Sequence, residues 1–100
     1  MTTDTLNRSD LLATLRQLKP LLMETYGVTR LGIFGSVARD EASATSDVDV
    51  VVEMPPNLFS MVHLKEHLQE SLQVSVDLVR YRPHMNAFLK QRIDQEAIYV

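Results

Sequence analysis

The segment from Asp47 to Glu53 constrains the fold of this chain more than any other part of the sequence. It begins by alternating aspartate with valine and continues in valines, a composition typical of a β-strand. Successive side chains of a strand point to opposite faces, so Asp47 and Asp49 share one face, with Cα atoms about 7 Å apart. The alternate valines share the other face, where a hydrophobic core would cover them: Val48, Val50 and Val52.

Two carboxylates this close on one strand repel each other, and burying them unpaired is costly. One solution is a solvated strand face, which is the commoner situation for acidic residues. The other is a divalent cation, because Mg²⁺ prefers carboxylate oxygens and completes its coordination with phosphate oxygens. Taken alone, the Asp-x-Asp pattern favours the solvated face.

A Gly-Ser pair stands ten residues before the acidic strand. The sequence predicts a strand over 29–34, a brief helix over about 36–40 and a polar loop over 41–46. Glycine lets the backbone approach a bulky ligand, and serine at a helix start offers a hydroxyl and N–H groups to an anion. By itself Gly35-Ser36 is more typical of a plain turn. Because the acidic strand follows and returns beside it, the Gly-Ser pair predicts hydrogen-bond donors for an anion next to carboxylates.

A third carboxylate lies in a predicted strand over Val74–Val79, where Asp77 points to the face opposite Val76 and Leu78. Aspartate is disfavoured in strands, and an exposed sheet edge explains it as well as a function does. Beside the Asp-x-Asp strand, Asp77 is a candidate metal ligand or base for an acceptor's proton. Two metal ions on three carboxylates would clamp both oxygens of an in-line displacement at phosphorus.

Helical patterns surround these strands. Ser9 or Asp10 is expected to cap a first helix that is kinked or restarted at Pro20 and ends at Gly27, with an apolar face of Leu11, Leu15, Leu18 and Leu22. Asn57 is expected to cap a second helix, whose apolar stripe is Met61, Leu64, Leu68 and Leu72. Pro83 is expected to open a last helix, before a short strand over 97–100. The alternation predicts an α/β fold, in one domain over 1–100.

Composition narrows the possible functions. The chain has no cysteine, which excludes disulfides and thiolate chemistry and suits a reducing cytoplasm. Its net charge of −3 argues against direct nucleic-acid binding by clustered positive charge. The first ten residues contain no secretory signal, and no apolar run approaches a membrane span. We therefore expect a cytoplasmic protein that does not contact membranes.

The residues Leu31–Arg39 and Ser46–Glu53 together resemble the minimal nucleotidyltransferases, or MNT-domain proteins. The signature of that family is Gly-Ser, ten residues, then Asp-x-Asp, and this chain has the same spacing. The run Val76–Val79 is similar to the family's third-strand carboxylate motif, and the resemblance extends to the closing residues 96–100. One departure is Asp40, where many relatives carry glycine.

This resemblance implies a polymerase-β-like palm, a small mixed sheet packed with helices. It implies that Gly35 and Ser36 bind the triphosphate of ATP, with Arg39 as a further candidate phosphate contact. It also implies that one or two Mg²⁺ ions bind the catalytic carboxylates, which are Asp47, Asp49 and Asp77.

The resemblance further implies a biological partner. Stand-alone members of this length are typically antitoxins that bind a HEPN-domain RNase toxin and transfer AMP from ATP to one of its tyrosines. Larger relatives carry a second domain, so here a partner is expected to complete the site. Two alternatives remain open: a binding module that neutralises the toxin sterically with weak catalysis, and a transferase acting on a small molecule.

Two other patterns have simpler explanations. The residues His63–His67 match the reversed zinc-protease motif, but a polar helix face is the better interpretation, because so short a chain has little protein for a peptide cleft. A modest basic cluster is expected to be a solvated face with some chance of contacting nucleotide or partner: Arg80, Arg82, Lys90 and Arg92.

Overall fold

The structure is a computed structural model that describes residues 7–41 and 47–100. Its described part contains three helices and four strands, in an order that confirms the predicted α/β fold. In chain order these are α1 (Arg8–Tyr26), β1 (Arg30–Phe34), β2 (Val48–Glu53), α2 (Leu58–Leu72), β3 (Val76–Arg80), α3 (Ala87–Glu96) and β4 (Ile98–Tyr99).

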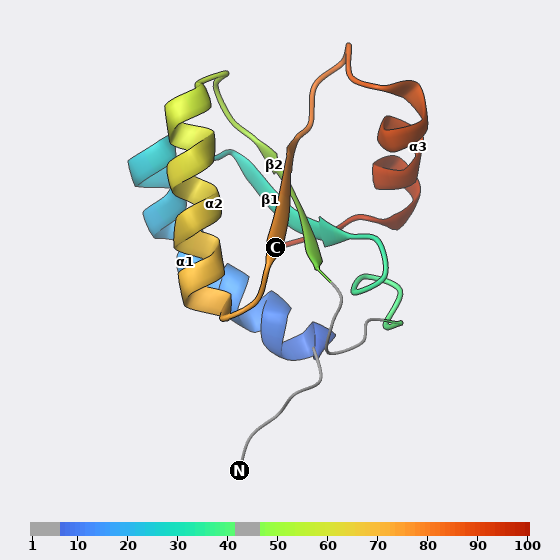
Figure 1. Cartoon of the computed structure of the whole chain (residues 1–100), viewed down its shortest axis with the longest axis horizontal. Helices are drawn as coiled ribbons and strands as arrows, with labels where there is room; N and C mark the ends of the chain where they lie inside the picture. The colour runs from blue at the N-terminus through green and yellow to red at the C-terminus, as the bar shows by residue number, and fades with distance from the viewer. Residues whose placement is uncertain (1–6, 42–46) are drawn as a thin grey trace.

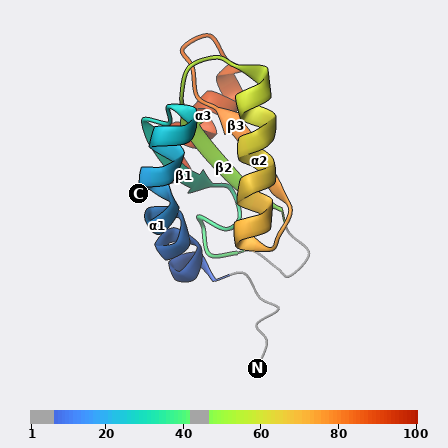
Figure 2. The same ribbon diagram turned by 90° about the vertical axis from the view of Figure 1, so that its left-hand side faces the viewer.

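The four strands form one mixed sheet in the order β3-β2-β1-β4. β1 pairs antiparallel with β2 and with β4, whereas β2 pairs parallel with β3. The parallel pair is possible because α2 carries the chain back across the sheet. Figure 1 shows α1 and α2 on one side of the sheet and α3 on the other, and Figure 2 shows α1 and α2 side by side in front of the strands.

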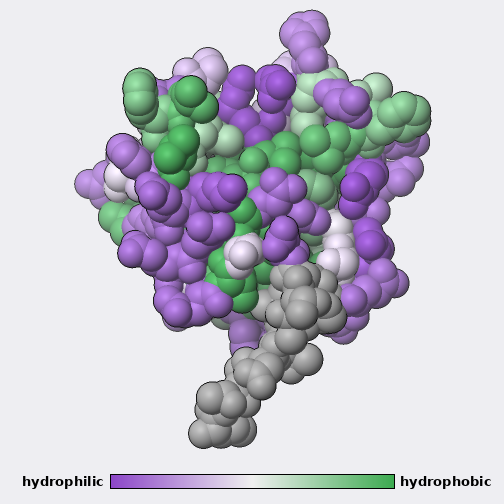
Figure 3. All heavy atoms as spheres, viewed as in Figure 1, coloured by the Kyte–Doolittle hydropathy of each residue, from purple (hydrophilic) through white to green (hydrophobic). Residues whose placement is uncertain are grey.

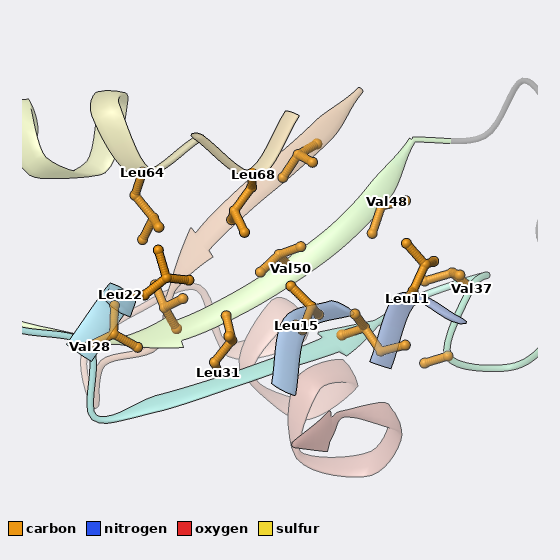
Figure 4. Close-up of a cluster of buried hydrophobic side chains, with 14 of the residues drawn as sticks. Leu11, Leu15, Leu22, Val28, Leu31, Val37, Val48, Val50, Leu64 and Leu68 are labelled. Atoms are coloured by element: carbon orange, nitrogen blue, oxygen red, sulfur yellow. The ribbon is translucent and has the colours of Figure 1, made fainter. Parts of the chain in front are cut away.

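The main hydrophobic core lies between the sheet and the α1/α2 layer (Figure 4). The alternation predicted for β2 is confirmed, since its three even-numbered valines are fully buried there. Each of the two helices contributes one apolar stripe to this core. The stripe of α1 includes Leu11, Leu15 and Leu22, and that of α2 includes Leu64 and Leu68. A smaller cluster lies under α3 on the other face, made by Phe34, Val51, Met85 and Ile93. The sheet therefore has one face devoted to packing and one only partly covered.

The helix starts differ from two expectations because asparagines cap them. α1 begins after Asn7, whose side chain accepts the N–H of Asp10 at 3.1 Å, so neither Ser9 nor Asp10 is the cap. α3 begins after Asn86, whose side chain accepts a backbone N–H at 3.0 Å, and Pro83 lies in the preceding turn. The cap expected at Asn57 is confirmed.

α1 does not restart at Pro20 but continues through it to Tyr26. It ends where predicted, at Gly27, which has the left-handed φ of 75° and donates its N–H to the Met23 carbonyl at 3.0 Å. The strands also begin slightly later than expected: β2 starts at Val48 and β3 at Val76. The short C-terminal strand is confirmed as β4.

Candidate functional site

The candidate site begins at Gly35, directly after the last residue of β1. Gly35 is buried and has φ of 75°, a conformation that L residues rarely adopt. A Cβ atom at this position would overlap the Asp49 Oδ2 atom and lie 3.1 Å from its Cγ. Glycine is thus required both by the turn and by the carboxylate packed against it, which joins the Gly-Ser turn to the acidic strand directly.

A tight turn follows Gly35, in place of the short helix expected over 36–40. The Arg39 N–H bonds to the Gly35 carbonyl at 3.1 Å, which makes a single helical turn. Asp40 then adopts φ of 60°, and Glu41 donates its N–H back to the Ser36 carbonyl at 2.8 Å. This pairing closes the turn as at a helix C-terminus. The left-handed residue explains why the helix does not continue.

The three predicted carboxylates come to the same side of the sheet but differ in exposure. Asp49 pairs with Phe34 of β1 and stands level with Asp77 of β3 in the parallel register. It is half-buried, whereas Asp77 is exposed. Asp47 is also exposed and lies just outside β2, one residue before its start. The structure therefore places Asp77 level with Asp49 and Gly35 in contact with it.

The electrostatics around Asp49 are unfavourable to its ionised form. Burial raises the pKa of the Asp49 carboxyl above its ordinary value, and repulsion from Asp77 adds to the rise. Attraction from Arg92 lowers this pKa, while Asp47 and Glu96 raise it again. Negative charge thus exceeds positive charge around a carboxylate that cannot reach full solvation, and a bound cation would relieve this excess.

The carboxylates do not form a closed metal cage. Within 7–41 and 47–100, no three His, Cys, Asp or Glu side chains converge closely enough to hold a metal ion. Mg²⁺ is commonly bound by one or two carboxylates together with water and substrate phosphates. Asp49, with Asp77 beside it, fits that mode of binding, in which the nucleotide brings the remaining oxygen ligands.

The structure adds a residue that the sequence pattern did not single out. Glu96, the last residue of α3, accepts the Gly35 N–H at 3.1 Å and the Arg39 Nη1 at 3.0 Å through the same Oε1 atom. The Nη2 atom of Arg92 lies 3.9 Å from that oxygen. The signals in the sequence were weak: Glu96 opens the closing segment 96–100 of the family resemblance, and it stands four residues after Arg92, a spacing that is common on solvated helices.

Arg39 lies beside Gly35, where the resemblance put a phosphate contact. Its guanidinium is held between two carboxylates, with Nε 2.9 Å from Glu41 Oε1 and Nη1 bonded to Glu96. The Glu41 hydrogen bond is the main reason that the pKa of Arg39 is raised above its ordinary value. The side chain is 41% exposed, so it can exchange one of these partners for a ligand.

The remaining candidates do not gather into a site. His67 packs edge-on against Tyr26, with ring centroids 6.4 Å apart, and the His63–His67 motif forms no metal group with other residues that the structure describes. The basic cluster is dispersed, since Arg80 bonds to the Met54 carbonyl at 3.4 Å and Lys90 pairs with Asp94 at 3.3 Å. No helix in the described part of the chain is long and apolar enough to cross a membrane.

The family model described as "Nucleotidyltransferase domain" matches residues 15–100 of this sequence. The chain belongs to the nucleotidyltransferase family. A relative named "Protein adenylyltransferase MntA", from Thermococcus cleftensis, is 36% identical over 84 residues, which make up 82% of this chain and 84% of that protein.

Solved structures agree with this assignment. One described as "Structure of putative minimal nucleotidyltransferase" superposes with a TM-score of 0.78 at 33% identity, covering 93% of this chain and 95% of the other. A complex described as tri-AMPylated Shewanella oneidensis HEPN toxin with MNT antitoxin gives a TM-score of 0.58 at 21% identity, covering 97% and 71%. The second likeness shows a shared fold. The predicted resemblance to minimal nucleotidyltransferases is confirmed.

Proposed function

We propose that this protein is an antitoxin that binds a HEPN-domain RNase toxin and transfers AMP from Mg·ATP to a tyrosine hydroxyl of that toxin. The observation that carries the proposal is the packing of Gly35 against the Asp49 carboxylate, with Asp77 level with Asp49 on the next strand. This contact brings a glycine turn suited to phosphate into register with carboxylates suited to a divalent cation.

Each residue has an assigned role in this proposal. Asp47, Asp49 and Asp77 would hold one or two Mg²⁺ ions, which when bound neutralise charge on the phosphates. Gly35 and Ser36 would receive the triphosphate at the turn. Arg39 would contribute positive charge to the same phosphates, for which its partly exposed guanidinium suits it.

The proposed reaction is an in-line displacement at phosphorus. The tyrosine oxygen of the acceptor attacks the α-phosphorus of ATP. The bond from that phosphorus to the oxygen bridging the β-phosphate breaks, so AMP remains on the acceptor and pyrophosphate leaves. The hydroxyl proton passes to a carboxylate, and we assign this role to Asp77 because it is exposed on β3 while Asp49 is half-buried.

Exposed hydrophobic side chains support a protein partner. Leu58, Phe59 and Val62 occupy the first two turns of α2 and are 75%, 77% and 49% exposed. We call these three residues the α2 patch. Figure 3 shows hydrophobic atoms gathered over the start of α2, at the upper left of that view. Clustered apolar surface of this kind marks contact sites. The relative named as a protein adenylyltransferase and the toxin–antitoxin complex of the same fold indicate which partner to test first.

A second candidate function is a binding module that neutralises the toxin sterically with little catalysis. The α2 patch supports this candidate as much as it supports the transferase, because both require contact with the toxin. The two candidates differ in one respect only. The carboxylates are essential in the first and dispensable in the second.

Intact-mass spectrometry of the partner toxin, incubated with this protein, ATP and Mg²⁺, separates the candidates. We expect the toxin to gain one or more AMP units with the wild-type protein and none with the double variant Asp47→Asn/Asp49→Asn. The matched control is Glu70→Gln, a carboxylate-to-amide change at an exposed position of α2, on the far side of the sheet. An unchanged toxin mass in a stable complex would support the binding module instead.

A further inference from the structure

We propose that Glu96 is a positioning residue for nucleotide binding, which holds the Gly35 turn and the Arg39 guanidinium in their places. This inference rests on the proposed function and adds to it a residue from the C-terminal end of α3. A backbone N–H and a guanidinium converge on one carboxylate oxygen, at 3.1 and 3.0 Å, beside the carboxylate of Asp49.

The Gly35 N–H needs this partner. Gly35 is buried, and a buried N–H without an acceptor carries a desolvation penalty. A charged acceptor gives a stronger hydrogen bond than a neutral one, and Glu96 supplies it to a glycine that is otherwise free to change conformation. The contact therefore fixes the orientation of the turn that would receive phosphate.

Arg39 depends on Glu96 for its direction. Its two carboxylate partners differ in exposure: the Glu41 side chain is 63% exposed and the Glu96 side chain is 21% exposed. Without Glu96, the guanidinium would still have its bond to Glu41, two residues along the turn. With Glu96 in place, the guanidinium is drawn toward the Gly35 backbone.

Glu96 itself is fixed from both sides. It ends α3, and β4 begins two residues later against β1, where Val100 donates its N–H to the Leu31 carbonyl at 2.9 Å. This pairing is close because Gly32 has no side chain: a Cβ atom there would lie 2.5 Å from the Ile98 carbonyl oxygen. The backbone pairing of β4 with β1 thus fixes the position of Glu96 at the end of α3.

The helix dipole of α3 does not favour a glutamate at this position. A negative charge in the last turn of a helix is disfavoured by the helix dipole, and α3 has no basic residue in that turn. Glu96 also adds to the negative charge felt by Asp49. Its contacts with Gly35 and Arg39 offset these costs, and they are the contacts that the proposal uses.

The test compares Glu96→Ala and Glu96→Gln with Glu41→Gln, a control that removes the other carboxylate from Arg39 but leaves Gly35 untouched. We expect Glu96→Ala to raise the KM for ATP and the Kd for AMP-PNP about tenfold, with a smaller change in kcat. Glu96→Gln should restore most of the loss because its amide oxygen still accepts both hydrogen bonds. Glu41→Gln should stay within about twofold of wild type.

A second measurement does not depend on activity. The Gly35 amide hydrogen should exchange with solvent at least about tenfold faster in Glu96→Ala than in wild type, and at the wild-type rate in Glu41→Gln. Thermal denaturation of each variant checks that the fold is intact. Unchanged exchange in Glu96→Ala would overturn the inference, and so would a lower KM in both Glu96 variants, which would make Glu96 a competitor of phosphate.

The failure of the proposed function has a different signature. A wild-type protein that neither transfers AMP nor binds AMP-PNP would refute that function, and the role of Glu96 toward nucleotide would fall with it. Wild-type transfer with equal KM in Glu96→Ala and Glu41→Gln would overturn the positioning role alone.

Discussion

Asp40 adopts a backbone conformation that an aspartate tolerates and a glycine prefers. Its φ of 60° lies in the left-handed region, and it closes the turn that carries Ser36 and Arg39. Aspartate visits this region more readily than most residues, because its short polar side chain can bond locally. The one departure from the family pattern noted in the sequence therefore falls on a residue whose backbone must adopt the left-handed conformation.

Replacing Asp40 by glycine should stabilise the protein. Relief of the left-handed strain outweighs the greater entropy of glycine in the unfolded chain, and we expect a net gain of about 0.5 kcal/mol. Asp40→Ala keeps the left-handed φ, which alanine tolerates less well than aspartate, so the free energy of unfolding should fall by about 0.5–1 kcal/mol. Chemical denaturation measures both. Equal stability of the glycine and alanine variants would contradict the assigned conformation.

The raised pKa of Asp49 has a consequence for stability. Folding increases the proton affinity of this carboxyl, so its contribution is most favourable at low pH and is lost as the pH rises through the folded pKa. At pH 7 the ionised group therefore destabilises the ligand-free protein. We expect Asp49→Asn to be more stable than wild type at pH 7.

This advantage of Asp49→Asn should shrink as the pH falls toward 3.8, the ordinary value for aspartate, because the wild-type carboxyl becomes protonated. Urea denaturation of both proteins across this range measures the difference. Asp10→Asn, at an exposed position in the first turn of α1, is the control. A difference between Asp49→Asn and wild type that does not depend on pH would exclude the electrostatic explanation.

At the scale of elements, the local patterns predicted which segments are helices and strands, except for the short helix expected over 36–40, which is a turn. The contacts between segments decided where the elements begin. The valine alternation of β2 and the leucine stripe of α2 identify those elements unambiguously, because one face of each is buried. Helix starts were less predictable, since Asn7 and Asn86 compete with nearby Ser, Asp and Pro residues that carry similar signals.

The α2 patch could not be predicted from the sequence either, because the spacing of its apolar residues resembles that of the buried apolar residues of the same helix. Only the packed helix shows that Leu64 is buried and Phe59 is 77% exposed. If the patch contacts the toxin, Phe59→Ser should weaken the complex at least about tenfold. It should change the unfolding free energy of the free protein by less than about 0.5 kcal/mol.

Calorimetric titration with the toxin tests this prediction, with Lys65→Ala as the control at an exposed polar position of the same helix. Toxin affinity that Phe59→Ser leaves unchanged would remove the α2 patch from the interface. Equal weakening by Lys65→Ala would indicate an effect on the helix rather than on the patch.

For the whole molecule, the division between the two faces of the sheet was predictable and the contribution of α3 to the site was not. The alternation in β2 is enough to assign valines to the core and aspartates to the other face. By contrast, Glu96 and Gly35 are 61 residues apart, and no periodicity links them. Their contact depends on the antiparallel pairing of β4 with β1, which only the assembled sheet specifies.

The strand order also determines how an acceptor can reach the site. β3 is an outer strand of the sheet, and in the described part of the chain no further strand pairs along its free edge. Asp77 lies exposed on this border strand, one strand away from Asp49. In the proposed reaction, an acceptor hydroxyl on the surface of a folded protein would reach Asp77 from this free side, and the surface of the acceptor would then cover the exposed carboxylate.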